Sequence, residues 1–470
     1  MTRFRTLDKD LDRIANAESA GLHSTRAVFR LGLAMTLVAA LAAIVAGANG
    51  TALGLLVAGG LVAAFLALST GANDVANTLG PAVGAGAIPM GAGLALVALA
   101  EVAGAVLAGD RVGGTLATGI LPAELMLSPG HDPATAMLAA MLAAAVWIAL
   151  AMWAGAPVSA THAIVGGIVG AGLAVYGPGA LHWRGLAGIA LAWIATPLAA
   201  AAAAALLLAG LRRAIHRVPD RARTAARRLP WMAGLVAAVL TANALSLGGA
   251  PLAATLAATL AAGALSGLTL RARMAGELAA GHPGRQLSDR LLGPLLVMGA
   301  VLMGFSHGAN DAANVIAPLA VLGRSTDFWP GAQPASVRLL ALGGAGIAGG
   351  ALLFGRRLVR MVGSRITRLN TARALCVLLA TAMTVLAATW LAMPVSTTHV
   401  AMGGVFGVGL YRDWEDRRFR TGRSRQPLPP EELHRRRLMR RAAVLRTLAA
   451  WVVTLPAVGG LAAGIAWAIG

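Results

Sequence analysis

Two short stretches with the same polar pattern place carboxylates inside apolar sequence. GANDVANTLGP occupies residues 71–81 and GANDAANVIAP occupies residues 308–318. A charge at bilayer depth costs roughly 2.5 to 3.5 kcal/mol even on a lenient insertion scale, so such residues are functional candidates by default. Carboxylate and amide oxygens are the ligands of a hard cation such as Na⁺. The candidate residues of these stretches are Asn73, Asp74, Asn77, Asn310, Asp311 and Asn314.

A second pair of stretches supplies hydroxyl groups. PVSATH occupies residues 157–162 and PVSTTH occupies residues 394–399. Proline suits the first turn of a helix and serine or threonine caps it, so both stretches are predicted helix starts. The N–H groups at a helix start favour an anion. The predicted oxyanion cradle consists of Ser159, Thr161, Ser396, Thr397 and Thr398.

The carboxylates of Asp74 and Asp311 would repel a bare anion. A bound cation or a proton on the anion reverses that effect. Phosphate near neutral pH keeps at least one OH group that can donate to a carboxylate, whereas sulfate is fully ionised. Hydroxyl and amide donors combined with two acidic acceptors therefore favour phosphate over sulfate.

Four further titratable residues lie near these motifs. His162 and His399 end the second pair of motifs; a structural hydrogen-bonding role is the simpler reading, and a proton relay is the alternative. His307 directly precedes the second GAND motif, whereas Thr70 stands at the matching place in the first half. Glu101 lies inside an apolar stretch and is a candidate for ion coupling or gating.

The motifs reveal an internal duplication. Both motif pairs are separated by the same 237 positions, from Asn73 to Asn310 and from Pro157 to Pro394. Residues 112–134 contain no Lys or Arg, whereas the matching residues 355–373 contain six arginines and no acid. Because basic loops stay in the cytoplasm, the two halves are predicted to be inverted.

Glycine and proline at matching places favour broken helices. Inverted repeats with interrupted apolar segments are typical of secondary transporters, with the substrate site near the midplane. Irregular backbone at that depth is tolerated only where it lines protein or a wet cavity. We expect interruptions at Gly71, Gly80, Pro81, Gly84, Gly86, Gly308 and Pro318.

Composition excludes a soluble protein. Of 470 residues, 57% are hydrophobic and only 12% are charged, against about 25% in soluble domains. Apolar blocks of about 20 residues predict an all-α polytopic membrane protein with about 12–13 transmembrane helices and re-entrant segments. The net charge of +20 comes from arginines between the blocks, which indicates orientation and anionic lipid contact, not nucleic acid. The single cysteine, Cys376, excludes an intrachain disulfide.

The predicted organisation has five parts. A polar lead and an extra, uncleaved helix occupy residues 1–50, repeat 1 residues 51–211, and a basic cytoplasmic linker residues 212–230. A helical hairpin and basic loop follow at 231–290, and repeat 2 occupies 291–470 with a basic cytoplasmic loop at 411–446. This arrangement places the N-terminus in the cytoplasm and the C-terminus outside.

The four motifs, together with EVAGAVLAGDRVGGTLATGI at 101–120, resemble the PiT family of inorganic phosphate transporters. The resemblance extends from about residue 52 to 470. It implies symport of phosphate with Na⁺ or H⁺ across the cell inner membrane, an inverted-repeat fold with the site between the halves, and commonly a homodimer. Thr78, Ile148 and Leu378 depart from the family pattern, which leaves the coupling ion open.

Other functions remain as alternatives. An intramembrane enzyme, such as a metal-dependent hydrolase, would use Asp74, Asp311 and the histidines. The chain lacks HExxH, G-x-S-x-G and P-loop motifs, so we expect no enzyme and no cofactor. A membrane sensor that binds phosphate without transport would signal through residues 411–446. Transport of sulfate, arsenate or a metal-phosphate complex is a variation on the symporter.

Overall fold

The structure is a computed structural model composed of helices. It describes residues 28–44, 52–122, 133–154, 158–216, 218, 220–280, 284–325, 336–366, 371–419 and 441–469. The predicted polar lead before residue 28, Pro157, and most of the predicted basic loop at 411–446 lie outside the described residues.

A short apolar helix, Val28–Ile44, precedes the first half. The first half contains α2 (Ala52–Gly84), α3 (Met90–Thr118), α5 (Pro133–Ala154), α6 (Ala160–Tyr176) and α7 (Trp183–Leu211). A hairpin of α8 (Arg221–Leu247) and α9 (Leu252–Ala279) follows. The second half contains α10 (Gly284–Ser325), α11 (Val337–Ile366), α12 (Thr371–Trp390), α13 (Thr397–Phe419) and α15 (Arg441–Ile469).

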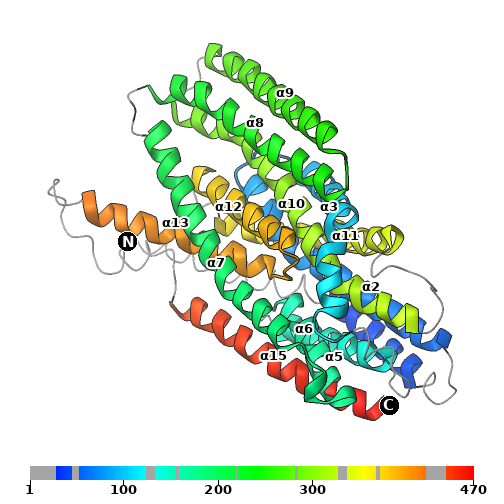
Figure 1. Ribbon diagram of the computed structural model, residues 1–470. Coiled ribbons are helices and arrows are strands. Elements are labelled where there is room, and N and C mark those ends of the chain that lie inside the picture. The colour runs from blue at the N-terminus through cyan, green and yellow to red at the C-terminus, as the bar shows by residue number, and fades with distance from the viewer. Residues whose placement is uncertain are drawn as a thin grey trace.

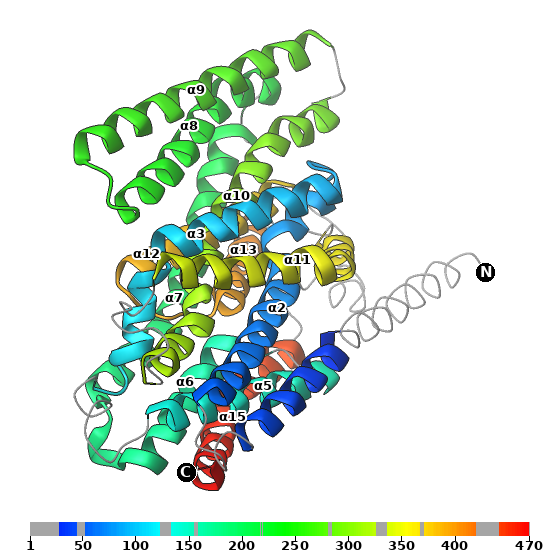
Figure 2. The same ribbon diagram turned by 90° about the vertical axis from the view of Figure 1, so that its right-hand side faces the viewer.

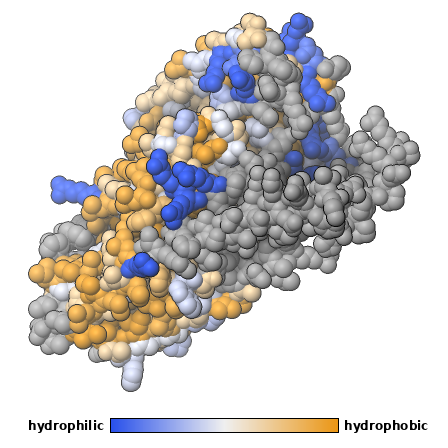
Figure 3. Space-filling model, turned by 180° about the vertical axis from the view of Figure 1, so that it is seen from behind, coloured by the Kyte–Doolittle hydropathy of each residue, from blue (hydrophilic) through white to orange (hydrophobic). Residues whose placement is uncertain are grey.

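Most of these helices are long and apolar enough to span a bilayer. Within the described residues ten helices satisfy both requirements, and Val28–Ile44 and α6 are shorter apolar helices. Figure 3 shows a broad apolar surface in which hydrophilic side chains gather in separate clusters. The chain is therefore an integral membrane protein with the all-α, polytopic fold that the sequence predicts.

The two halves pack against each other reciprocally. The first helix of each half lies against the second helix of the other: α2 contacts α11, and α10 contacts α3. The same exchange recurs later in the chain, where α6 contacts α15 and α13 contacts α7. These pairs lie side by side in Figures 1 and 2. Two equivalent halves would produce this pattern, which fits the predicted duplication.

Glycines make the reciprocal contacts close. A Cβ atom on Gly71 would overlap the carbonyl of Ile347, and one on Gly308 would overlap the carbonyl of Glu101. The pairs Gly71/Gly308 and Glu101/Ile347 are 237 and 246 positions apart. The duplication therefore extends to individual backbone contacts between helices, where only glycine permits such a close approach.

The same is true of the later helices. A Cβ atom on Gly170 would overlap Gly459, and a Cβ atom on the matching Gly407 would overlap Ala201. These glycines allow α6 to lie against α15 and α13 against α7. The repeated small residues are thus packing positions shared by both halves.

The predicted helix breaks at the GAND motifs are wrong at most of their positions. Helix α2 continues through Gly71, Gly80 and Pro81 to Gly84, and α10 continues through Gly308 and Pro318. Gly71 and Gly308 serve the helix packing described above, which explains glycine without a break. Only the turn after α2 agrees with the prediction, since Gly86 there has a φ of 69°.

The chain does break at the PVS motifs. Val158 and Ser159, which directly precede α6, are not helical, and we call these two residues tip 1; residues Leu391–Ser396 separate α12 from α13 and form tip 2. Ser159 accepts a hydrogen bond from the backbone N–H of His162 at 3.2 Å, and Ser396 accepts one from the N–H of His399 at 3.5 Å. Both predicted helix caps are confirmed. Ala392 in tip 2 has a φ of 55°, which marks a sharp turn.

The α8–α9 hairpin stands apart from this arrangement. Figure 2 shows it along one end of the molecule, with α9 on the outer side. Leu252, Leu260 and Leu265 of α9 are 74%, 72% and 65% exposed. This hairpin has no counterpart in the duplication, and α8 begins at Arg221, inside the residues 212–230 that were predicted as a basic linker.

Candidate functional site

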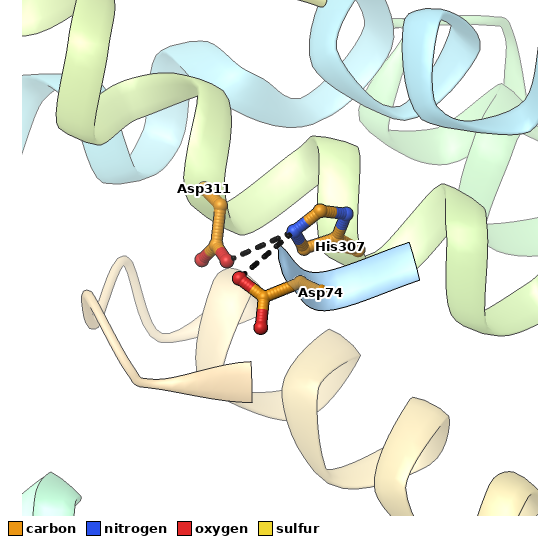
Figure 4. Close-up of side chains that lie close together, drawn as sticks. All are labelled: Asp74, His307 and Asp311. Atoms are coloured by element: carbon orange, nitrogen blue, oxygen red, sulfur yellow. Dashed lines mark ion pairs between the residues drawn. The ribbon is translucent and has the colours of Figure 1, made fainter. Parts of the chain in front are cut away.

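Two aspartates and a histidine converge where the first helices of the two halves meet. Asp74 lies on α2, and His307 and Asp311 lie one turn apart on α10 (Figure 4). The Nε2 atom of His307 is 3.2 Å from Asp311 Oδ2 and 3.7 Å from Asp74 Oδ2. One imidazole nitrogen thus lies between the carboxylates of the two motifs.

Glu101 extends this cluster into the protein. Its Oε1 atom is 2.8 Å from His307 Nδ1, and both side chains are fully buried. The imidazole therefore connects the carboxyl of α3 to the motif aspartates. A buried acid without a partner is costly, and the contact with His307 explains how Glu101 is accommodated.

The acid and the histidine occur only once in the duplicated structure. Ile347 stands in α11 at the place that Glu101 occupies in α3, and Thr70 stands in α2 at the place of His307. The site therefore combines a symmetric pair of aspartates with an asymmetric Glu–His pair.

Matching hydrogen bonds join each GAND motif to the helix that follows the tip of the other half. This tip helix is α13 for the first motif and α6 for the second. Asn77 Nδ2 donates to Thr398 Oγ1 at 3.2 Å, and Asn314 Nδ2 donates to Thr161 Oγ1 at 3.1 Å. The two bonds relate to each other by the offset of 237 positions. All four residues were candidates in the sequence, and the structure brings them together in pairs.

The aspartates differ in their hydroxyl partners. Thr398 Oγ1 donates to Asp74 Oδ1 at 2.5 Å, across the halves. Thr397 Oγ1 donates to Asp311 Oδ2 at 3.1 Å, within the second half. Ala160 stands at the place matching Thr397, so the first half has no equivalent of this second bond.

Some buried acceptors in the second half lack a partner. Among the described residues, Asp311 Oδ1 and Asn314 Oδ1 are buried without a hydrogen-bond donor. An unpaired buried acceptor costs free energy unless a cation or a donor satisfies it. Asp74, His307 and Asp311 also have ligand atoms within 4.8 Å of one another. The sequence predicted a cation site with oxygen ligands only. In the structure the Nε2 nitrogen of His307 also belongs to the cluster.

Asn310 holds tip 2 in place. Its Oδ1 accepts from the N–H of Val395 at 3.0 Å, and its Nδ2 donates to Met393 O and Thr389 Oγ1 at 3.1 Å each. Thr161 Oγ1 donates to Val395 O at 3.3 Å. The side-chain amide of Asn310 is thus committed to the backbone of the tip. Thr389 was not a sequence candidate, because the first half has Met152 at that place.

His162 and His399 meet each other. Their ring centroids are 4.7 Å apart, and His162 also lies 3.9 Å from the ring of Trp193. Trp193 Nε1 donates to Pro394 O of tip 2 at 2.9 Å. These two histidines therefore contact each other across the halves, and both roles named in the sequence analysis, hydrogen bonding and proton relay, stay predictions.

The two GAND motifs differ in exposure. Asn310, Asp311 and Asn314 are 0–3% exposed, whereas Asn73, Asp74 and Asn77 are only partly buried. Asp74 retains 16% side-chain exposure against 4% for Asp311. The site is therefore less enclosed at the first motif than at the second.

Comparisons with known proteins agree with these features. The model of the Phosphate transporter family matches residues 70–462. A Helicobacter pylori protein named "Putative phosphate permease" is 33% identical over 86% of this chain and 78% of its own length. The Arabidopsis thaliana protein "Inorganic phosphate transporter 2-1, chloroplastic" is 30% identical over 86% of this chain and 70% of its own. A solved structure described as "The sodium-dependent phosphate transporter" covers 88% of this chain and 98% of its own, with 27% identity and a TM-score of 0.77.

Proposed function

We propose that this chain, which belongs to the Phosphate transporter family, imports inorganic phosphate by symport with a cation, and that the cluster around Asp74 and Asp311 is its substrate site. The observation that carries the proposal is the meeting of both GAND motifs with both PVS helices at one place. Alternating access requires a site built from both halves, because both halves then contact the same substrate.

The phosphate would be held by hydroxyl groups and helix N-termini. Ser159 and Ser396 accept from backbone N–H groups, which leaves their hydroxyl hydrogens for a phosphate oxygen. The hydroxyls of Thr161, Thr397 and Thr398 are donated to protein acceptors, so binding would exchange those acceptors for phosphate. An OH group of the phosphate would donate to Asp74 in place of Thr398.

The driving cation would satisfy the unpaired oxygens of the second motif. Asp311 Oδ1 and Asn314 Oδ1 are hard oxygen acceptors on one face of α10. Asp74 and Asn77 would contribute the corresponding oxygens of the first motif. The name of the similar solved structure supports Na⁺ as this cation. Cation and phosphate would each bind better in the presence of the other, since neither alone neutralises the site.

The Glu101–His307 pair supplies an alternative coupling route. The imidazole contacts both aspartates on one side and Glu101 on the other. A proton on this chain of groups would enter and leave with phosphate. His162 and His399, which contact each other, would serve as a second relay.

The proposed import has a direction. The arginine-rich ends of repeat 2 and the linker would face the cytoplasm, with the N-terminus inside and the C-terminus outside. Rocking of the two halves around the site would then open it to each side in turn.

The test is uptake of labelled phosphate into proteoliposomes containing the purified chain. A Na⁺ gradient and a pH gradient are imposed in turn, with excess sulfate as competitor. Accumulation driven by the Na⁺ gradient and unaffected by sulfate is expected. Accumulation driven by the pH gradient alone would show that the coupling ion is a proton and would assign the coupling to Glu101 and His307. Phosphate binding without accumulation in either gradient would favour the sensor and end the symporter proposal.

A further inference from the structure

An arginine and a tryptophan meet beside tip 2. The guanidinium carbon of Arg111 on α3 is 4.5 Å from the ring centroid of Trp390, the last residue of α12. Trp390 Nε1 donates to Asn243 Oδ1 of α8 at 2.6 Å. Thr115 Oγ1 of α3 donates to Ala392 O at 2.6 Å. These contacts hold the start of tip 2 against α3 and α8.

The same two residue types recur in the other half. Trp153 lies near the end of α5, 237 positions before Trp390, which is the offset of the motifs. Arg357 lies on α11, 246 positions after Arg111, which is the offset between Glu101 and Ile347. The duplication therefore places an arginine and a tryptophan at the matching positions, Arg357 on α11 and Trp153 on α5.

Only one of these pairs is formed. Trp153 is 70% exposed and Arg357 is also exposed, and among the described residues the two side chains share no ring contact. The asparagines of the two GAND motifs also differ in their contacts with the tips. Asn310 binds the backbone of Val395 and is fully buried, whereas Asn73 is partly exposed. Tip 2 is thus held against its neighbours by contacts that the described residues at the matching places, Trp153, Arg357 and Asn73, do not form.

We propose that Arg357 and Trp153 are gating residues that form the matching cation–π contact when the site opens on the side of tip 2. The inference rests on the proposed alternating access. Two equivalent halves that exchange conformations must exchange their contacts, so the Arg111–Trp390 pair opens as the Arg357–Trp153 pair closes. Each pair stabilises one end state of the cycle.

Cysteine cross-linking tests this exchange directly. Cys376, the sole cysteine, is buried and is first replaced by alanine to give a cysteine-free chain. One variant then carries Trp153→Cys with Arg357→Cys, and the matched control carries Trp390→Cys with Arg111→Cys. Both are treated in proteoliposomes with a short bifunctional thiosulfonate reagent, with and without phosphate and the driving cation. Cross-linking is read by mass spectrometry, and labelled phosphate uptake is measured before and after reduction.

Opposite responses are expected. The 111–390 pair should react readily without substrate, and the 153–357 pair should react several-fold faster when phosphate and cation are both present. Either cross-link should stop uptake, and reduction should restore it. If the 153–357 pair never reacts, or reacts without stopping uptake, while the control pair behaves as described, the gating assignment is overturned.

A single substitution gives an independent readout. Arg111→Ala removes the contact seen in the structure and should raise the rate of 153–357 cross-linking by about twofold to fivefold, the factor that an exposed cation–π contact represents. Arg356→Ala, at an exposed arginine next to Arg357, is the matched control and should leave the rate unchanged. Equal rates in both variants would contradict the exchange.

Failure of the gating pair can be told apart from failure of the symport. If the unmodified chain accumulates no phosphate but Arg111→Ala still raises 153–357 cross-linking, the gating pair stands and the symport falls. If uptake is normal and the 153–357 pair stays apart in every condition, the symport stands and the gating pair falls.

Discussion

The two GAND motifs share a backbone arrangement and differ in their charged neighbours. Each lies on a continuous helix, packs a glycine against a carbonyl of the other half, and donates an asparagine hydrogen bond to the other half's tip helix. Only the second has a histidine one turn before its aspartate and a buried glutamate against that histidine. The duplication thus supplies the scaffold twice, and the Glu–His pair is added once.

This difference separates two roles within one site. The asparagine–threonine bonds are formed in both halves at once, so under the proposed alternating access they would persist through the cycle and suit binding and packing. The Glu101–His307 pair has no counterpart to alternate with and would stay between α3 and α10. Glu101 and His307 are therefore better placed to tune charge than to open or close the site.

The largest expected effect comes from breaking the asymmetric pair. His307→Thr, which introduces the residue found at the matching place in α2, leaves Glu101 buried without its partner. Removing one member of a buried ionic pair costs about 3–5 kcal/mol of stability. The thermal unfolding temperature in detergent should fall accordingly, and uptake should be lost.

The double variant sharpens the same comparison. Glu101→Ile introduces the residue found at the matching place in α11, so His307→Thr with Glu101→Ile makes both halves apolar or neutral there. Stability should return towards that of the unmodified chain, because no buried acid remains unpaired. A double variant as unstable as the single His307→Thr variant would show that the pair does not act as a unit.

An intermediate effect is expected at the aspartates. Asp74→Asn and Asp311→Asn each replace a charged acceptor with a neutral one of similar shape. A hydrogen bond to a charged group contributes about 1.5–3 kcal/mol, which corresponds to about a 10-fold to 150-fold loss in apparent affinity. Labelled phosphate uptake should be abolished at low substrate, while the protein remains in the membrane. Near-normal uptake by either variant would remove that aspartate from the site.

The smallest effect should appear at the helix caps, where the halves are most alike. Ser159→Ala and Ser396→Ala each remove one cap, at a cost of about 1 kcal/mol. The fall in unfolding temperature should be similar for both, with Ser→Thr variants as controls that retain the cap. An effect confined to Ser396 would show that tip 1 is not held by its cap. A further loss of apparent phosphate affinity would agree with hydroxyl donation to substrate.

The sequence predicted much of the fold and the site because both depend on repeated local patterns. Apolar blocks of spanning length predicted the membrane helices, and the equal spacing of the motifs predicted two matching halves. The caps at Ser159 and Ser396 followed from the position of serine after proline. The tryptophans Trp153 and Trp390 carry the same signal, since they are also 237 positions apart.

The predicted helix breaks at the GAND motifs were wrong because glycine can serve two structural roles in a membrane helix. Gly71 and Gly308 permit either an irregular backbone or a close helix contact, and their neighbours in sequence do not distinguish these roles. The carbonyls of Ile347 and Glu101, which come from the opposite half, decide in favour of the close contact. Such long-range partners are invisible to a local pattern.

The sequence by itself determined the membrane class, the duplication, the residue types of the site and the two helix starts, because each depends on spacing and composition along the chain. Tertiary structure alone decided that His307 lies between Asp74 and Asp311, that Glu101 meets it, and that Asn310 and α3 hold tip 2. These contacts join α2, α3 and α10 and the two tips across more than 200 positions of sequence. Their geometry follows from how helices of the two halves pack, and helix packing is set by the fit of whole surfaces.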